Sequence, residues 1–261
     1  MFPREHGAWS MLAQPFLCAL ILAREWSWYA LPAAAAAAAV FLVRIPLITL
    51  ARQRWVWTAP HPETALAWRW LAGLGAALLV CAAVLAQRWP IALLLGCGAL
   101  ATALTTFAVW MTVRNRQRSV ALQVVSAAGL TGSCAAACLS VLGTMPGWGW
   151  WLWGLSAAHA AAGILVVHAR LEARIAARKK LDQPNPWRKP ALIAQAVLLV
   201  LAPVAALRSP WLGAALALSA VVHLRALARL AETVDTPLTT VGLRALGLSC
   251  AVSALLILGL W

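Results

Sequence analysis

Long apolar blocks separated by short polar connections dominate this sequence. Nine blocks cover residues 7–23, 28–50, 65–86, 90–112, 119–143, 148–168, 190–207, 210–230 and 239–260. Most are close to the length that spans about 30 Å of hydrocarbon as an α-helix. Because hydrocarbon holds no water to pair with backbone groups, such blocks must be helical. The pattern predicts an all-α integral membrane protein with nine transmembrane helices in a single polytopic domain, residues 1–261.

The composition supports a membrane protein rather than a soluble one. Hydrophobic residues make up 63% of the 261 residues, and only 11% are charged. A soluble domain would have roughly 25% charged residues. Turn signals such as Met145-Pro146-Gly147 and Ser209-Pro210 stand between blocks, and no stretch has the composition of a separate soluble domain.

The formal charge of +14 predicts an orientation. Nine spans put the N-terminus and 18 of the 21 cations on one face: Arg4, Arg44, Arg52, Arg54, Arg69, Arg114, Arg116, Arg118, Arg170, Arg174, Arg178, Lys179, Lys180, Arg188, Lys189, Arg225, Arg229 and Arg244. The opposite face has only Arg24, Arg88 and Arg208. By the positive-inside rule, we expect a bacterial inner-membrane protein with a cytoplasmic N-terminus and Trp261 outside. The charge then reflects topology and anionic membrane lipids, and we expect no nucleic-acid partner.

The richest candidate chemistry lies in and after the sixth block. At 100° per residue, His159, Gly163, Arg170 and Arg174 share one helical stripe, and His168 lies on the opposite side. Ionisable groups at membrane depth are costly and often functional. The stripe predicts a deep histidine beneath two guanidinium groups that bind an anion. The alternative is a histidine bonded to neighbouring backbone beside two arginines that only set topology.

Three other places supply candidate binding residues. Arg4 and His6 precede the first block, Arg44 lies about two turns before the cytoplasmic end of the second, and Arg114 belongs to a short basic loop. Each also has a simpler explanation, as an amphipathic lead-in, a snorkelling side chain or a topology signal. His223, near the end of the eighth block, ranks below His159. A bis-histidine haem site formed by His159 and another helix stays open, although no second deep histidine is obvious.

Aspartate is scarce, which bears on cofactors. Asp182 and Asp235 are the only two aspartates, and no block has the paired carboxylates that Mg²⁺ prefers. The six cysteines form no CxxC or CxxCH pattern, which disfavours structural zinc and covalently attached haem. Mg²⁺ is therefore disfavoured, and an anion on the cytoplasmic side would be bound directly by Arg and His.

The opening Pro3-Arg4-Glu5-His6-Gly7-Ala8-Trp9-Ser10-Met11, followed by Pro15-Phe16, resembles the start of the YwiC-like family of bacterial membrane proteins. His159 followed by Arg170, Leu171 and Arg174 is similar to a second segment of that family. The resemblance implies a multi-pass membrane protein and specifies no reaction.

A more distant similarity is to the UbiA superfamily of intramembrane prenyltransferases. It implies nine helices, a cytoplasmic N-terminus and a UbiA-like helical bundle with a lateral cavity. Where that family has Asp-rich motifs for Mg²⁺ and prenyl diphosphate, this chain has residues 44–48 and 168–172, with basic groups in place of aspartates.

Together these features predict a protein that binds or transforms an anionic isoprenoid or tetrapyrrole (haem-like) lipid without the usual Asp/Mg site. The expected mouth combines Arg4, His6, Arg44, Arg114, His159, Arg170 and Arg174. Two alternatives stay open: a non-catalytic lipid carrier or an accessory or assembly factor of a respiratory membrane complex, and, ranked last, a secondary transporter. The sequence identifies no catalytic residue, cofactor or protein partner.

Overall fold

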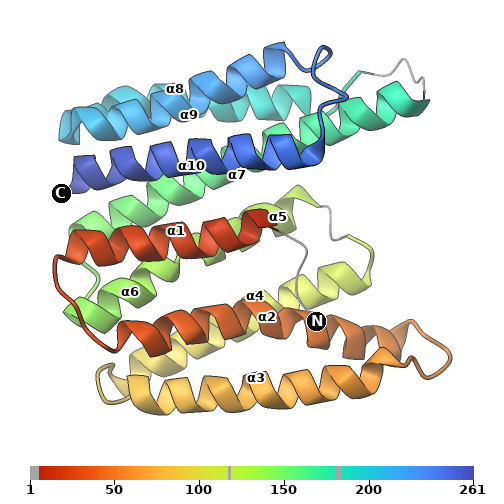
Figure 1. Cartoon of the computed structure of the whole chain (residues 1–261), viewed down its shortest axis with the longest axis vertical. Coiled ribbons are helices and arrows are strands. Elements are labelled where there is room, and N and C mark those ends of the chain that lie inside the picture. Colours follow the sequence, from red (N-terminus) through yellow and green to blue (C-terminus); the bar gives the residue numbers. More distant parts are fainter. Residues whose placement is uncertain (1–5, 117–118, 180–183) are drawn as a thin grey trace. The chain divides into compact units, whose positions relative to one another are not determined.

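The computed structural model describes residues 6–116, 119–179 and 184–261, and all regular structure in these ranges is helical (Figure 1). The helices are α1 (His6–Ala23), α2 (Ala30–Trp55), α3 (Glu63–Leu85), α4 (Ile91–Val113), α5 (Val120–Thr131), α6 (Ser133–Leu142), α7 (Gly147–Lys179), α8 (Arg188–Arg208), α9 (Pro210–Ala228) and α10 (Leu238–Leu260).

Eight helical segments are long and apolar enough to cross a membrane, with α5 and α6 counted together as one. The prediction of a multi-pass helical membrane protein is confirmed at this level. Each of the nine apolar blocks is largely helical, but the apolar helix Gly7–Ala23 is shorter than the other eight segments. A ninth span would require α1 to cross as well.

Two element boundaries differ from the predicted blocks. The sixth block was expected to end at residue 168, but α7 continues to Lys179. Residues 169–179 are mostly Ala, Leu, Glu, Arg and Lys, which favour helix in water as well as in lipid. The block 119–143 is divided at Gly132 into α5 and α6. Glycine is a weak helix former because it loses more backbone entropy than other residues.

The chain forms two compact units, unit 1 (Met1–Trp150) and unit 2 (Trp151–Trp261). In unit 1, α2 packs against α3, α4 and α6, and α1 packs against α5 and α6. The α1–α6 contact is tight, because the Ser133 hydroxyl donates a hydrogen bond to the Leu12 carbonyl at 2.6 Å. Cys18, Cys134 and Cys138 are buried and fill the interior of unit 1 as small apolar side chains.

Unit 2 is built on the α8–α9 hairpin, which turns at Ser209-Pro210. Helix α10 packs on α9. Helix α7 joins them through an apolar cluster in which Val166 and Ala169 of α7 meet Ala191 of α8 and Leu227 of α9. The Gln195 side chain of α8 is fully buried and donates to the Ala162 carbonyl at 3.2 Å. Both apolar and polar contacts therefore hold the helices of unit 2 together.

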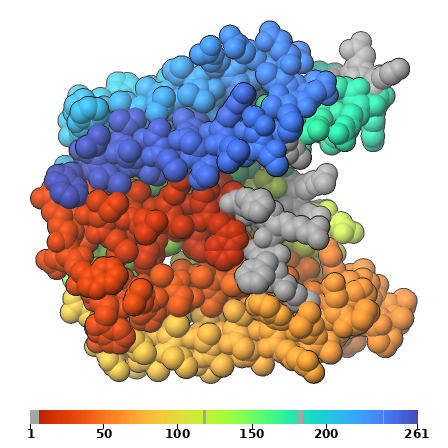
Figure 2. Space-filling view, in the orientation of Figure 1, coloured from red at the N-terminus to blue at the C-terminus, as the bar shows by residue number. Residues whose placement is uncertain are grey.

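The outward faces of the helices are strongly apolar. In the space-filling view, α2 and α3 (orange to gold) present one continuous surface (Figure 2). Leu66, Trp68, Leu79 and Val80 of α3 are all exposed. Such side chains on a long apolar helix are expected to face lipid rather than water.

Gly213 of α9 allows the close approach of α8 and provides a test of this packing. A Cβ atom on Gly213 would lie 2.7 Å from the Ala202 carbonyl oxygen and 2.7 Å from the Ala206 Cβ. The Gly213→Ala variant should therefore destabilise the protein by about 1–3 kcal/mol, as overpacking does elsewhere. Thermal unfolding in detergent, followed by tryptophan fluorescence, measures the loss.

Gly242→Ala in α10 is the matched control, because a Cβ atom there meets nothing within 4 Å. Alanine favours helix over glycine by roughly 0.8–1 kcal/mol, so this control should be neutral or stabilising. If Gly213→Ala is as stable as Gly242→Ala, the tight α8–α9 contact is wrong.

Candidate functional site

The most organised polar group in unit 2 surrounds His159 of α7. Its Nδ1 lies 2.7 Å from the Ser219 hydroxyl of α9, and its Nε2 lies 3.1 Å from the Ser249 hydroxyl of α10. Both ring nitrogens are thus within hydrogen-bond distance of hydroxyl groups. The His223 ring of α9 is stacked against the His159 ring, with centroids 5.8 Å apart and planes 15° apart. We call these four residues, His159, Ser219, His223 and Ser249, the histidine pair with its serines.

Helical spacing explains why these residues meet. His159 and Gly163 are four residues apart on α7, and Ser219 and His223 are four residues apart on α9, so each pair shares one face. His159 meets Ser219, and Gly163 meets His223 one turn further along. A Cβ atom on Gly163 would lie 3.5 Å from His223 Cε1, so glycine leaves the room that the imidazole ring occupies.

His223 is therefore a candidate that sequence analysis ranked too low. No second deep histidine is obvious from the sequence, whereas in the structure the His223 ring stacks on the His159 ring. The i, i+4 spacing of Ser219 and His223, which repeats that of His159 and Gly163, was the available signal. This spacing points to His159 only once the packing of α9 against α7 is known.

Two buried polar atoms near this group lack a hydrogen-bond partner among the described residues. They are Nδ1 of His223 and Oε1 of Gln195. Gln195 belongs to α8 and reaches Ala162, which precedes Gly163 on α7. A buried polar atom without a partner is costly, and it often marks a place where a proton, water or ligand is accommodated.

A second polar group, which we call the arginine cluster, consists of Arg170, Arg174 and Arg244. Arg170 donates from Nη2 to the Thr233 carbonyl in the connection between α9 and α10. Arg174 and Arg244 are close enough to act electrostatically on Arg170. Nε of Arg174 is buried and has no hydrogen-bond partner among the described residues. The cluster gathers three guanidinium groups from α7 and α10.

Three residues of the predicted α7 stripe face the same neighbouring segment. His159, Gly163 and Arg170 all contact α9 or the connection that follows it. His168 lies on the opposite side, where its ring is 5.1 Å from the Trp187 ring. The role of these residues in binding stays a prediction.

The remaining candidates belong to unit 1. The Arg44 guanidinium lies 5.3 Å from the centre of the Phe41 ring, and Trp9 meets the same ring edge-on at 5.0 Å. Arg114 ends α4, is exposed and stacks on Trp110 at 4.5 Å, as an interfacial anchor would.

Arg4 lies outside the described residues, and so does the side chain of His6, with which α1 begins. That all these residues share one mouth with Arg170 stays a prediction.

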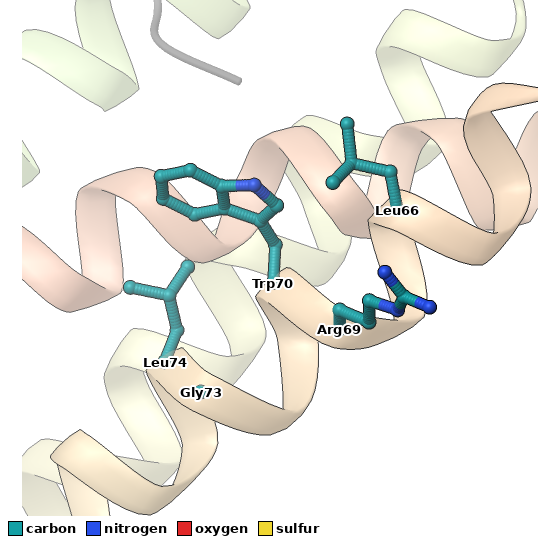
Figure 3. Close-up of a pocket in the computed structure, with 5 residues that line it drawn as sticks. All are labelled: Leu66, Arg69, Trp70, Gly73 and Leu74. Carbon is teal, nitrogen blue, oxygen red and sulfur yellow. The ribbon is translucent and has the colours of Figure 1, made fainter.

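Unit 1 also has a shallow hollow of about 290 Å³ on α3, lined by Leu66, Arg69, Trp70, Gly73 and Leu74 (Figure 3). Gly73 leaves open space, since a Cβ atom there would meet nothing within 4 Å. Figure 3 shows the Arg69 side chain extending toward the N-terminal end of α3, as a snorkelling arginine does. The lining of the hollow is mostly apolar, as a surface in contact with a lipid chain would be.

Among the described residues, no three or more His, Cys, Asp or Glu side chains are grouped so that they could hold a metal ion. His159 also presents no free ring nitrogen for axial coordination of haem, because both nitrogens face serine hydroxyls.

The comparison with protein families matches the N-terminal half of the chain. A family model described as "YwiC-like protein" matches residues 2–139, from the N-terminal segment into α6. No curated protein and no solved structure matches the chain. The matched residues lie in unit 1, whereas the histidine pair and the arginine cluster lie in unit 2.

The contacts of His159 generate a stability prediction. Ser219→Ala removes the hydroxyl 2.7 Å from His159 Nδ1 and leaves a buried ring nitrogen without its partner. We expect a loss of about 0.5–2 kcal/mol in the free energy of unfolding, in line with hydrogen bonds inside helical membrane proteins. Thermal unfolding in detergent measures it.

Ser253→Ala is the matched control, because it removes a serine hydroxyl one turn beyond Ser249 on the same helix, α10. It should cost less than either Ser219→Ala or Ser249→Ala. Equal effects at all three positions would contradict a specific His159–serine arrangement.

Proposed function

This chain belongs to the YwiC-like protein family, and we propose that it binds an anionic isoprenoid or tetrapyrrole lipid at the arginine cluster of unit 2. We further propose nine spans, a bacterial inner-membrane location, a cytoplasmic N-terminus and a UbiA-like bundle with a lateral cavity. In the described residues, eight span-length apolar segments with α1 as a ninth, together with the separation of the cations, support the nine spans and the orientation.

The observation that carries the proposal is the charge of the arginine cluster. Arg174 and Arg244 both act electrostatically on Arg170, and among the described residues none of the three forms an ion pair with a carboxylate. Three like charges repel one another, and the repulsion grows where water screens it poorly. An anion between them would relieve it.

Guanidinium groups favour particular anions. Arginine binds phosphate, diphosphate and carboxylate groups through paired N–H donors in a fixed planar geometry. Nε of Arg174 is a buried donor available for such a bond. Both a prenyl diphosphate and a tetrapyrrole propionate have the required oxygens.

A lipid is favoured over a soluble anion because of where the cluster lies. Arg170 and Arg174 follow the apolar part of α7, and Arg244 lies near the start of α10. An anionic head group at the arginines would have its apolar tail beside the membrane-spanning parts of these helices. The positive-inside rule puts this end in the cytoplasm.

The arginines could also stabilise charge that develops on a departing head group, partly replacing a metal. A lipid carrier or an accessory factor of a respiratory complex needs the same arginines without a chemical step. Turnover of the added lipid separates these two functions, and binding is common to both.

The binding test uses the purified full chain in phosphatidylcholine nanodiscs, with farnesyl diphosphate and haem as probes. Arg170→Ala and Arg174→Ala should each weaken binding by about 10-fold or more, because each removes a charge-assisted hydrogen bond. Arg208→Ala is the control, since Arg208 is an exposed arginine outside the cluster, at the C-terminal end of α8. Mass spectrometry of the purified protein should also detect a co-purified anionic lipid.

Two results would count against the proposal. One is that neither probe binds and no lipid co-purifies. The other is that the Arg170 and Arg174 variants bind as well as the Arg208 variant.

A separate test addresses orientation. We expect a tag at the N-terminus to be protected from protease in intact spheroplasts, and alkaline phosphatase fused after Trp261 to be active. Fusion after Arg116 should be inactive, since this arginine lies in a basic connection after α4. An accessible N-terminal tag together with an active C-terminal fusion would mean eight spans, with α1 not crossing.

A further inference from the structure

We propose that His159 and His223, with the hydroxyls of Ser219 and Ser249, form a proton-binding site within unit 2 that is coupled to anion binding at the arginine cluster. The anion half of this inference rests on the proposed function. The proton half rests on the geometry of the histidine pair with its serines.

The hydroxyl partners suit both charge states of His159. A neutral imidazole has one N–H donor and one acceptor nitrogen, whereas an imidazolium has two donors. A backbone carbonyl can serve only an N–H donor, but a serine hydroxyl can either accept or donate. With Ser219 at 2.7 Å and Ser249 at 3.1 Å, His159 keeps both partners whether or not it holds the extra proton.

His223 extends the site to a second imidazole. Its ring is nearly parallel to that of His159, at 5.8 Å, and its Nδ1 is buried with no partner among the described residues. Two imidazolium ions at this separation would repel each other in a medium of low dielectric constant. The pair is therefore suited to hold a single proton, in equilibrium between the two rings.

The surroundings of the pair contain cations and no carboxylate among the described residues. Gln195 of α8 is uncharged. The charged side chains on the helices that carry the pair and its serines include Arg170 and Arg174 of α7, Arg225 of α9 and Arg244 of α10. The acids of unit 2, Glu172, Asp182, Glu232 and Asp235, come later on α7 or in the connections that follow α7 and α9. Proton uptake therefore adds positive charge near other positive charges.

This charge distribution couples the two sites. Gly163, against which His223 lies, precedes Arg170 by seven residues, about 10 Å along the helix. An anion at the arginine cluster lowers the positive potential at the histidine pair and favours proton uptake. By linkage, the proton must favour anion binding to the same degree. The anion should thus bind more tightly at low pH, where the pair holds its proton, and more weakly as the pH rises.

The test measures farnesyl diphosphate binding to the full chain in phosphatidylcholine nanodiscs between about pH 4.5 and about pH 8, a window that extends below the usual titration range of histidine because the pair is buried among cations. Calorimetry in two buffers with different ionisation enthalpies also gives the number of protons taken up. The variants are His223→Asn and His159→Gln. His61→Gln is the matched control, since His61 lies in the connection between α2 and α3 of unit 1.

For the wild type and His61→Gln, we expect affinity to fall with rising pH by about 5-fold more than for the His223 and His159 variants. Both should also take up more protons on binding than those variants. The titration of the probe itself is common to all proteins and cancels in the comparison. His223→Asn leaves both serine contacts of His159 in place, so it tests the pair even if His159→Gln fails to fold.

The outcomes are distinguishable. If every variant binds with the same pH dependence and proton uptake as the wild type, the proton site is wrong and the anion site stands. If the wild type binds neither farnesyl diphosphate nor haem at any pH and no anionic lipid co-purifies, both the coupling and the proposed function are overturned.

Discussion

Hydrocarbon has no water to pair with polar groups, and the structure of this chain follows from that constraint. Backbone groups are paired within helices, and short polar side chains are paired back onto the same helix. The Thr112 hydroxyl donates to the Ala108 carbonyl at 2.7 Å, and the Ser140 hydroxyl donates to the Ala136 carbonyl at 2.7 Å. Where a polar side chain instead points toward another helix, it must find its partner there, and this makes such contacts specific.

The two units use this constraint differently. In unit 1 the polar contact between α6 and α1 is a hydroxyl bonded to a backbone carbonyl, as in Ser133 to Leu12. In unit 2 the Gln195 amide likewise donates to the Ala162 carbonyl, and the His159 ring in addition pairs with the side chains of Ser219 and Ser249. A backbone carbonyl can only accept a hydrogen bond, whereas a hydroxyl or imidazole group can act as donor or acceptor. The serine hydroxyls around His159 can therefore keep their hydrogen bonds through a change of protonation, as the proposed proton site requires.

Family membership and chemistry also divide between the units. The match to the YwiC-like family covers residues 2–139, whereas the arginine cluster and the histidine pair lie beyond it in α7, α9 and α10. The N-terminal segment around Arg4 and His6, which carries the family resemblance, contains ionisable groups of its own. The function proposed here assigns anion binding to unit 2, and the family segment supplies the framework of α1 to α6.

The sequence by itself determined the all-helical membrane character, nearly all the helix positions and the shared face of His159, Gly163 and Arg170, because these depend on hydropathy and on the 3.6-residue period alone. It ranked His223 low and left Arg244 among the cations that set topology. Only the tertiary structure decided that Ser219 and His223 face α7 and that Arg244 joins Arg170. The reason is physical: the relative shift of two packed helices depends on interdigitated side chains far apart in the sequence, and no local period records it.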